Sequence, residues 1–291
     1  MRRFLGWIIL FLVALGLIPI LFNTELSLFA KIAGFIVLLS IIVALRVWGY
    51  QTKAKSPRQE RVHFNKNDVF WIEKHIPFFR FLNKRDKKIF LDRMGLFIAN
   101  IKITEVDKET AENETKFYVA ASAVIAYWGL PFWNYGALSE VLVYPSNFHD
   151  EQTLHTLGAI QGKVFHGGLM NNTIILSRPA LLAGFNIGND KKNVGVHEFA
   201  HLLDKSDGEI DGVPSVVLGK VDRKIWLQVM QQEMVKWSAQ KSTIPAYALK
   251  SEAEFFAVVT EYFKECPKLL KRKNPELYDV LVQIYGVPPN L

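Results

Sequence analysis

The chain has 291 residues, of which 50% are hydrophobic and 22% are charged, with a formal net charge of +7 and a single cysteine. One cysteine excludes a fold held by internal disulfides, and no repeat or low-complexity tract interrupts the chain. Residues 1–55 carry six basic side chains and one acidic side chain, which accounts for most of the positive surplus. No basic stripe or recognisable module is left to predict nucleic-acid binding.

Two apolar runs lie within the first 50 residues. Residues 4–22 form nineteen positions without a charge, close to the ~20 needed to cross a hydrocarbon core. Residues 32–48 form a second run after a short polar loop, with Lys31 and Arg46 near its ends. A cleaved signal peptide is disfavoured, because its apolar stretch spans roughly 7–15 residues and because a second run follows. We therefore expect a transmembrane helical hairpin within residues 1–55 and a polar linker over residues 56–67.

Basic residues predict the orientation of this hairpin. They flank its outer ends, at Arg2, Arg3, Arg46, Lys53, Lys55, Arg58 and Arg61. Positive flanks stay inside, so we expect both ends of the hairpin in the cytoplasm. The lone Cys266 agrees with a reducing compartment. The prediction is a multi-pass protein of the inner (cytoplasmic) membrane, with a cytoplasmic domain over residues 68–291.

The remaining residues are enough for one domain with a substantial core. Hydrophobic periodicity predicts helices over residues 86–101, 117–128, 193–206, 220–240, 251–265 and 275–285, and strands over residues 140–144 and 172–177. This pattern predicts an α+β domain dominated by helices. We expect the segment Thr173–Ser177 to be an edge strand that aligns an extended substrate by backbone pairing.

The run His197-Glu198-Phe199-Ala200-His201 carries the chemistry. Asn193 is a candidate cap for a helix through this run, and residues four apart on a helix project from one face. Both imidazoles can then hold one Zn²⁺, an ion that activates water for hydrolysis while a neighbouring glutamate takes the proton. His197 and His201 are thus candidate metal ligands, and Glu198 is the candidate general base.

A third ligand is needed, and residue spacing leaves it open. Asp207 lies six residues after His201, but the glycine that would bend the chain back is absent. Glu254 and Glu261 lie seven residues apart on one face of the helix predicted over residues 251–265, each among apolar neighbours. Glu254 also fits a capping box with Ser251, and Glu261 also fits an ordinary buried acid paired with a lysine or a backbone amide.

Other polar and aromatic residues have weaker claims. Asp204 shares the face of both histidines and is a candidate acceptor for a ring nitrogen, whereas Asp211 fits turn formation. Trp128, Trp133 and Tyr135 fit either a substrate cleft or, more simply, the core. Several histidines have no second ligand at metal spacing and predict structural or solvated roles: His63, His75, His149, His155 and His166.

The chain resembles the MtfA-like zinc peptidases, a family of the gluzincin type. The resemblance rests on Val141–Ser146, Thr173–Ser177, Asn193–Asp204, Asp211–Pro214 and Glu254–Val258, which stand in the family's order and cover about residues 70–285. It implies one zinc per chain, held by His197, His201 and Glu254, with Glu198 as general base. A more distant similarity to the catalytic domain of anthrax lethal factor implies that Tyr247 donates a hydrogen bond to the developing oxyanion.

Two functions are compatible with these residues. The first is a membrane-anchored zinc metallopeptidase acting on a peptide or protein substrate, for which the resemblance implies aminopeptidase-like activity. The second is a membrane-tethered regulatory module with a structural zinc, because the resembled family is linked to control of sugar uptake through a transcriptional regulator, a regulatory protein partner. Glu198 favours the enzyme, since a structural site needs no unbound carboxylate beside the metal.

Overall fold

A computed structural model of the chain describes Ser27 and residues 61–130, 135–146, 162–164, 172–186, 191–214, 217–218, 221–238 and 244–289. The chain divides into two units after residue 59, and all described residues except Ser27 belong to the second unit. The predicted membrane hairpin lies outside the described residues and stays a prediction. Within the described ranges, no helix is long and apolar enough to cross a bilayer.

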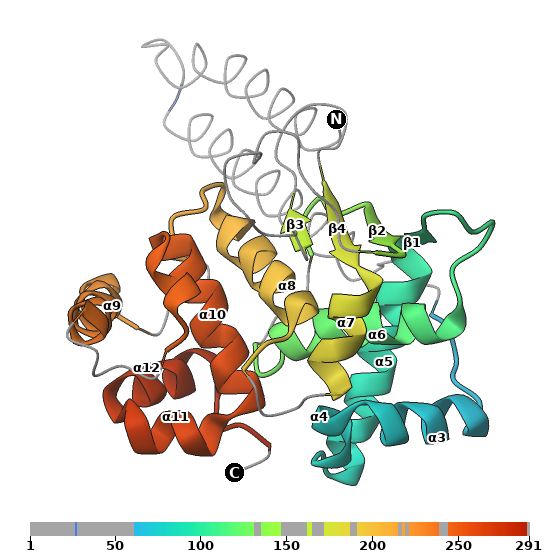
Figure 1. The fold of residues 1–291 in the computed structure, drawn as a ribbon, viewed down its shortest axis with the longest axis horizontal. Coiled ribbons are helices and arrows are strands. Elements are labelled where there is room, and N and C mark those ends of the chain that lie inside the picture. Colours follow the sequence, from blue (N-terminus) through green and yellow to red (C-terminus); the bar gives the residue numbers. More distant parts are fainter. Residues whose placement is uncertain are drawn as a thin grey trace. The chain divides into compact units, whose positions relative to one another are not determined.

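The second unit has the predicted α+β architecture dominated by helices (Figure 1). Every helix and strand predicted between residues 86 and 285 is present. The elements are α3 (Lys66–His75), α4 (Pro77–Arg80), α5 (Lys84–Asn100), β1 (Lys102–Glu105), α6 (Asn113–Ala126), β2 (Glu140–Tyr144), β3 (Gly162–Val164), β4 (Thr173–Ser177), α7 (Arg178–Asn186), α8 (Val194–Asp204), η3 (Lys205–Asp207), α9 (Arg223–Ser238), η5 (Ala246–Leu249), α10 (Glu252–Glu265), α11 (Pro267–Lys273) and α12 (Pro275–Tyr285).

The described strands form one sheet in the order β1-β2-β4-β3. Strands β1, β2 and β4 are parallel, with Val141 of β2 opposite Ile174 of β4, and β3 pairs antiparallel with β4. The expectation that Thr173–Ser177 is an edge strand is wrong, because β4 is paired on both sides and all five of its residues are buried. The edge strand next to β4 is β3, which has only three residues and was not predicted.

The linker before the domain is shorter than predicted. Asn65 caps α3, where its side chain accepts from the amides of Asn67 and Asp68. Upstream of this cap, the Val62 amide donates to the Gly95 carbonyl at 3.1 Å. Gly95 is needed there, because a Cβ at this position would lie 2.2 Å from the Val62 carbonyl oxygen. Residues from 61 onward are therefore part of the domain.

Helix α6 is the central helix of the core, and most of its residues are buried. Its small side chains allow α8 to approach closely. At the contact, a Cβ on Gly195 of α8 would lie 2.1 Å from the Ser122 hydroxyl oxygen of α6. Helix α8 carries the two histidines, and this packing holds its first turn against the centre of the domain.

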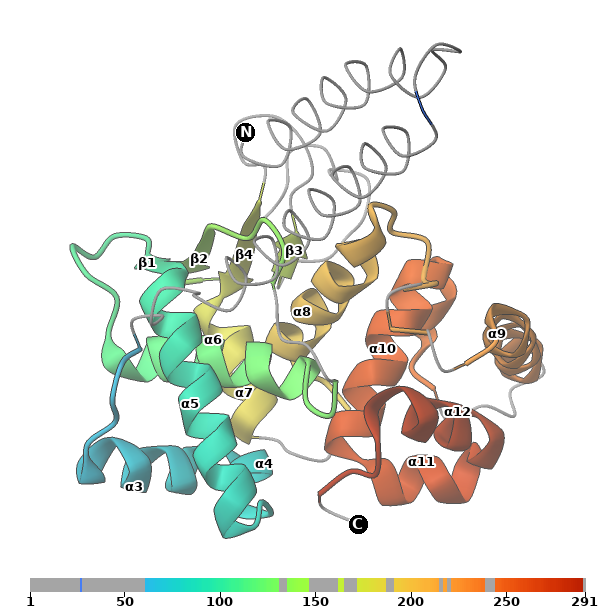
Figure 2. The same ribbon diagram turned by 180° about the vertical axis from the view of Figure 1, so that it is seen from behind.

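The domain has a hydrophobic core of its own. Buried side chains of this core extend from Ile72 to Tyr285. Figures 1 and 2 both show α8 between the group of α5 and α6 and the group of α10, α11 and α12. Because the core of the described residues is complete within this unit, we expect the domain to fold without residues 1–59.

Candidate metal centre

Asn193 sets the start of α8 and joins it to two other helices. Its side chain accepts from the Val196 amide at 3.1 Å and donates to the Gly184 carbonyl of α7 at 3.1 Å. Its backbone amide donates to a carboxylate oxygen of Glu261 on α10. All these groups are buried, so the first turn of α8 is held in place relative to α7 and α10.

Three candidate ligand atoms converge on one point. His197 Nε2 lies 3.0 Å from Glu254 Oε2 and 3.1 Å from His201 Nε2, and His201 Nε2 lies 3.4 Å from Glu254 Oε2. Tetrahedral ligands at about 2.0–2.1 Å from a zinc-sized ion are separated by about 3.3 Å, close to these three distances. Two imidazole nitrogens and one carboxylate oxygen are also the donor types of hydrolytic metal sites. The residues therefore fit a small divalent cation.

Glu261 lies behind His197, away from the converging atoms. Its Oε2 accepts a hydrogen bond from His197 Nδ1 at 3.0 Å, while its other oxygen accepts from the Asn193 amide. A proton held on Nδ1 leaves the lone pair of Nε2 facing Glu254 and His201. Of the two glutamates that spacing left open, Glu254 is thus the one beside both Nε2 atoms, and Glu261 orients the first histidine.

The electrostatics of the site favour a positive charge between these groups. Burial opposes the charged imidazolium of His197, yet the carboxylates of Glu254 and Glu261 outweigh it and raise the pKa of His197 well above its usual value. Burial tends to raise the pKa of Glu254, but hydrogen bonds with His197 and His201 outweigh burial and hold this pKa below the usual range. The two carboxylates thus stabilise positive charge at this point.

Glu198 and Tyr247 border the site without joining the three converging atoms. The Glu198 side chain is 5% exposed, and burial raises its pKa. Tyr247 lies on η5, 45% exposed, with its ring centroid 5.8 Å from that of His197 and the Lys250 ammonium 4.0 Å from its own centroid. Partial burial and then the Glu254 carboxylate raise the pKa of Tyr247, so its hydroxyl stays protonated and can donate a hydrogen bond.

Asp204 holds the loop that follows α8. Its Oδ2 accepts from the Gly212 amide at 2.8 Å, the Gly212 carbonyl accepts from Trp226 Nε1 at 2.7 Å, and a Cβ on Gly212 would lie 2.2 Å from the Glu252 carbonyl oxygen. The predicted bond from Asp204 to a histidine ring is absent among the described residues, where Asp204 Oδ1 and His201 Nδ1 are both buried without a partner. Instead, Asp204 ties the loop that reaches the start of α10.

The other sequence candidates lie away from the converging atoms. Asp207 is exposed on η3, so the alternative third ligand is not supported by its position. Asp211 has the predicted turn role, since its Oδ1 accepts from the Val213 amide at 3.0 Å. Tyr135 is a core residue, with its ring 5.9 Å from Phe199. Trp133, His149, His155 and His166 lie outside the described residues.

A protein-family model described as glucose-regulated metallo-peptidase M90 matches residues 50–286. The chain belongs to this family. Membership identifies it as metallopeptidase-like and confirms the resemblance to the MtfA-like proteins found from the sequence. A metal is implied by the family, and the residues around His197 provide a place for it.

The relatives of this M90 chain include an uncharacterized protein and proteins named Mlc titration factor A. It is 28% identical over 225 residues to an uncharacterized protein of Synechocystis sp., covering 74% of this chain and 81% of the relative. It is 32% identical over 162 residues to Mlc titration factor A of Pectobacterium atrosepticum, and 30% identical over 162 residues to that of Escherichia fergusonii. In both cases the match covers 52% of this chain and 60% of the titration factor.

Proposed function

We propose that this protein is a zinc-dependent peptidase anchored to the inner membrane by residues 1–55, with its catalytic domain in the cytoplasm. His197, His201 and Glu254 hold the metal, and Glu198 is the general base. The observation that carries this proposal is the convergence of two Nε2 atoms and one Glu254 oxygen, with Glu198 outside that donor set. Structural zinc sites usually have four protein ligands, whereas three ligands and a free carboxylate are typical of hydrolytic sites.

The chemistry divides between the metal and the residues around it. When bound, zinc supplies Lewis acidity that polarises a peptide carbonyl and makes water easier to deprotonate. The Glu198 carboxylate takes a proton from the attacking water and delivers it to the amine that leaves when the C–N bond breaks. The Tyr247 hydroxyl donates a hydrogen bond to the oxyanion that develops on the carbonyl oxygen.

Strand β3 is the proposed guide for an extended substrate. It is paired only with β4 among the described strands, and it packs beside α8 (Figure 1). A peptide added to the edge of β3 that no described strand pairs with would make backbone hydrogen bonds with little dependence on side chains. This role replaces the one that the sequence assigned to Thr173–Ser177.

The test compares purified full-length protein with zinc, after chelation, and as Glu198→Gln. We expect Glu198→Gln to keep one zinc per chain and to lose cleavage of a fluorogenic peptide library by roughly 10²–10⁴-fold, the usual contribution of a general base. Glu252→Gln, at an exposed position, is the matched control and should cleave normally. Undiminished cleavage by a zinc-loaded Glu198→Gln variant would show that another group is the base.

A regulatory function is the second candidate. It is favoured by the name Mlc titration factor A, which describes those relatives as titrating Mlc. For this chain we propose a protein partner bound by the cytoplasmic domain, with zinc in a structural role. This function would be favoured over the peptidase by two results together. The protein would bind one zinc per chain without cleaving any peptide in the library, and it would capture a defined regulator.

A further inference from the structure

Positive charge is concentrated at one end of the domain. Residues 61–93 contain nine basic and four acidic side chains, whereas residues 94–291 contain 19 basic and 22 acidic side chains. The first of these segments comprises α3, α4 and most of α5. The domain therefore has one basic segment joined to a remainder that is slightly acidic.

The acidic side chains of the basic segment already have partners. They pair as Asp68 with Asn65, Glu73 with Lys87, Asp86 with Asn83, and Asp92 with Arg61. Exposed cations are left with no ion-pair partner among the described residues: Lys66, Lys74, Arg80, Lys84, Arg85 and Lys88. We call these six residues, together with the exposed Phe70 and Phe81, the α3–α5 face.

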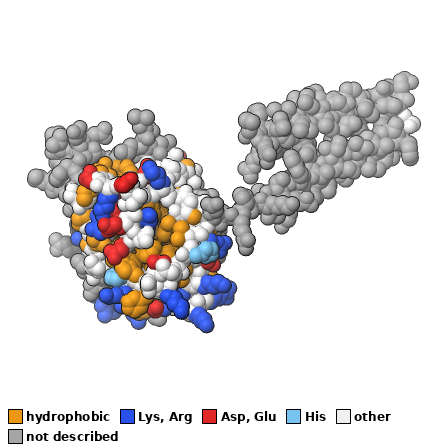
Figure 3. Space-filling view, turned by 90° about the vertical axis from the view of Figure 1, so that its right-hand side faces the viewer, with side chains coloured by type: hydrophobic (Ala, Val, Ile, Leu, Met, Phe, Trp, Pro, Cys, Tyr) orange, Lys and Arg blue, Asp and Glu red, His pale blue; other side chains and the backbone are white. Residues whose placement is uncertain are grey.

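Two aromatic rings of this face point into solvent. Phe70 is 71% exposed and Phe81 is 59% exposed. Leaving a phenylalanine ring in water is unfavourable, so two exposed rings among cations are typical of a contact surface. Figure 3 shows Lys and Arg side chains gathered along the lower edge of the molecule, with hydrophobic side chains between them.

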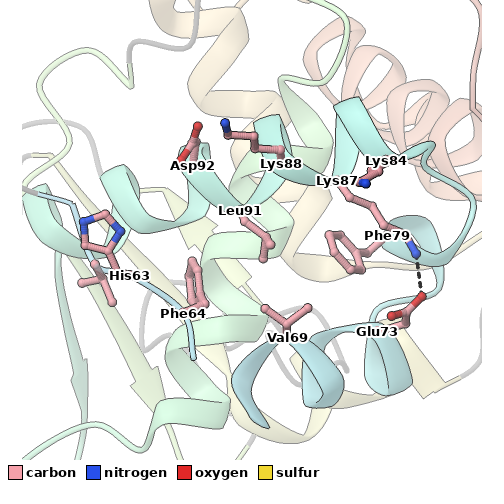
Figure 4. A pocket seen from close by; sticks show the side chains of 11 residues that line it. His63, Phe64, Val69, Glu73, Phe79, Lys84, Lys87, Lys88, Leu91 and Asp92 are labelled. Carbon is pink, nitrogen blue, oxygen red and sulfur yellow. Dashed lines mark hydrogen bonds and ion pairs between the residues drawn. The ribbon is translucent and has the colours of Figure 1, made fainter. Parts of the chain in front are cut away.

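A pocket of about 360 Å³ opens between α3 and α5 (Figure 4). Apolar side chains, lysines and two carboxylates that are paired with other cations share its lining: Phe64, Val69, Phe79, Leu91, Lys84, Lys88, Glu73 and Asp92. Lys87 also lines it and is paired with Glu73 at 2.5 Å. An apolar surface bordered by free ammonium groups matches a molecule with an anionic head and an apolar tail.

We propose that the α3–α5 face docks the domain on the anionic surface of a lipid bilayer. Its cations face acidic phospholipid head groups, and Phe70 and Phe81 enter the interface. This docking rests on the proposed membrane anchor: twelve residues separate position 48 from Arg61, so at ~3.5 Å per residue Arg61 can lie at most about 45 Å from the end of the second apolar run. These twelve residues carry Lys53, Lys55 and Arg58 against Glu60, a net charge of +2.

The test uses the domain from residue 61 onward, which has its own core and lacks the hairpin. Its partition is measured by co-sedimentation with phosphatidylcholine vesicles that contain about 30% phosphatidylglycerol, and with vesicles of phosphatidylcholine alone. We expect binding only to the anionic vesicles. The triple variant Arg80→Glu, Lys84→Glu, Lys88→Glu should partition about a hundredfold less, since each basic residue near an anionic surface contributes roughly a fivefold factor.

Helix α11 provides a matched control, because it also presents exposed cations. The triple variant Lys268→Glu, Arg272→Glu, Lys273→Glu makes the same charge change there and should bind within about threefold of the parent domain. Circular dichroism confirms folding of both variants. Equal losses in the two triple variants would overturn the proposal, as would tighter binding to a DNA duplex than to the anionic vesicles.

The aromatic rings give a second and independent readout. Phe70→Ala and Phe81→Ala keep the charge, so a fall in partition of several-fold for each would locate the contact at this face. Unchanged partition in both variants would contradict insertion of the rings. None of these residues lies near the metal centre, so peptide cleavage in solution should be unaffected, and a failure here leaves the peptidase proposal standing.

Discussion

Replacing Glu261 by glutamine separates the role of a metal ligand from that of a residue that orients one. In the variant, the amide oxygen is expected to accept from the Asn193 backbone amide, because that donor is fixed at the start of α8. The side-chain NH₂ then faces His197 Nδ1 and can only donate. The imidazole must accept at Nδ1, so its proton moves to Nε2, the atom 3.0 Å from Glu254.

The expected loss of zinc affinity in Glu261→Gln has a definite size. Loss of a carboxylate behind a ligating histidine weakens metal binding by roughly 10–100-fold, or about 1.4–2.7 kcal/mol. Folding should suffer little in Glu261→Gln, because both hydrogen bonds can still form. Glu261→Ala instead leaves two buried donors unpaired, each at about 1–3 kcal/mol, so we expect a loss of roughly 2–6 kcal/mol in the free energy of unfolding.

Competition between the protein and a chromophoric zinc chelator measures the affinity, and urea unfolding measures the stability. Glu254→Gln, which removes the candidate ligand itself, should lose more zinc affinity than Glu261→Gln, while Glu252→Gln should behave as wild type. Zinc binding by Glu261→Gln as tight as that of the parent would contradict an orienting role for Glu261. Zinc lost completely in Glu261→Gln and retained in Glu254→Gln would exchange the two roles.

Two further predictions concern the loop after α8. Gly212→Ala should lower the free energy of unfolding by about 3 kcal/mol or more, because φ is +73° and the new Cβ would lie 2.2 Å from the Glu252 carbonyl oxygen. Gly136→Ala is the control, with φ +62° and open space where its Cβ would lie. It should lower the free energy of unfolding by only about 1 kcal/mol in the same urea titration. Burial raises the pKa of Asp204 from 3.8 to about 7. The contribution of the protonated side chain to the free energy of unfolding is therefore complete below about pH 4 and is lost as the pH rises through 7. Asp204→Asn should therefore gain stability relative to wild type by about 2.6 kcal/mol between pH 5 and pH 8 in the presence of a chelator, and an unchanged difference would contradict a buried, protonated aspartate.

Local sequence patterns were sufficient for the long helices and for the histidine motif. The spacing of His197 and His201 needs only a helix, and both α8 and α10 carry strong periodicity and a recognisable cap. The choice between Glu254 and Glu261 was beyond spacing, because seven residues place both carboxylates on one face of α10. What separates them is a tertiary fact, the position of the Asn193 amide against the second glutamate.

The elements missed from the sequence are short or lie in polar surroundings. Helix α3 begins inside the predicted linker, although Asn65 and Asp68 form a capping box that marks its start. Helix α7 has nine residues and follows β4 directly, so neither its length nor its flanks separate it from the strand. Sheet order is not encoded in any one strand, which is why the edge position of β3 could not be anticipated.

The loop from α8 to α9 has consequences for protein engineering. At Gly212 both backbone polar groups are engaged, by Asp204 and by Trp226, and the glycine itself abuts the first turn of α10. Surface loops usually accept extra residues or affinity tags at little cost, but this segment sets the spacing between the two helices that carry the candidate ligands. We expect a single inserted residue here to lower zinc affinity while the domain still folds.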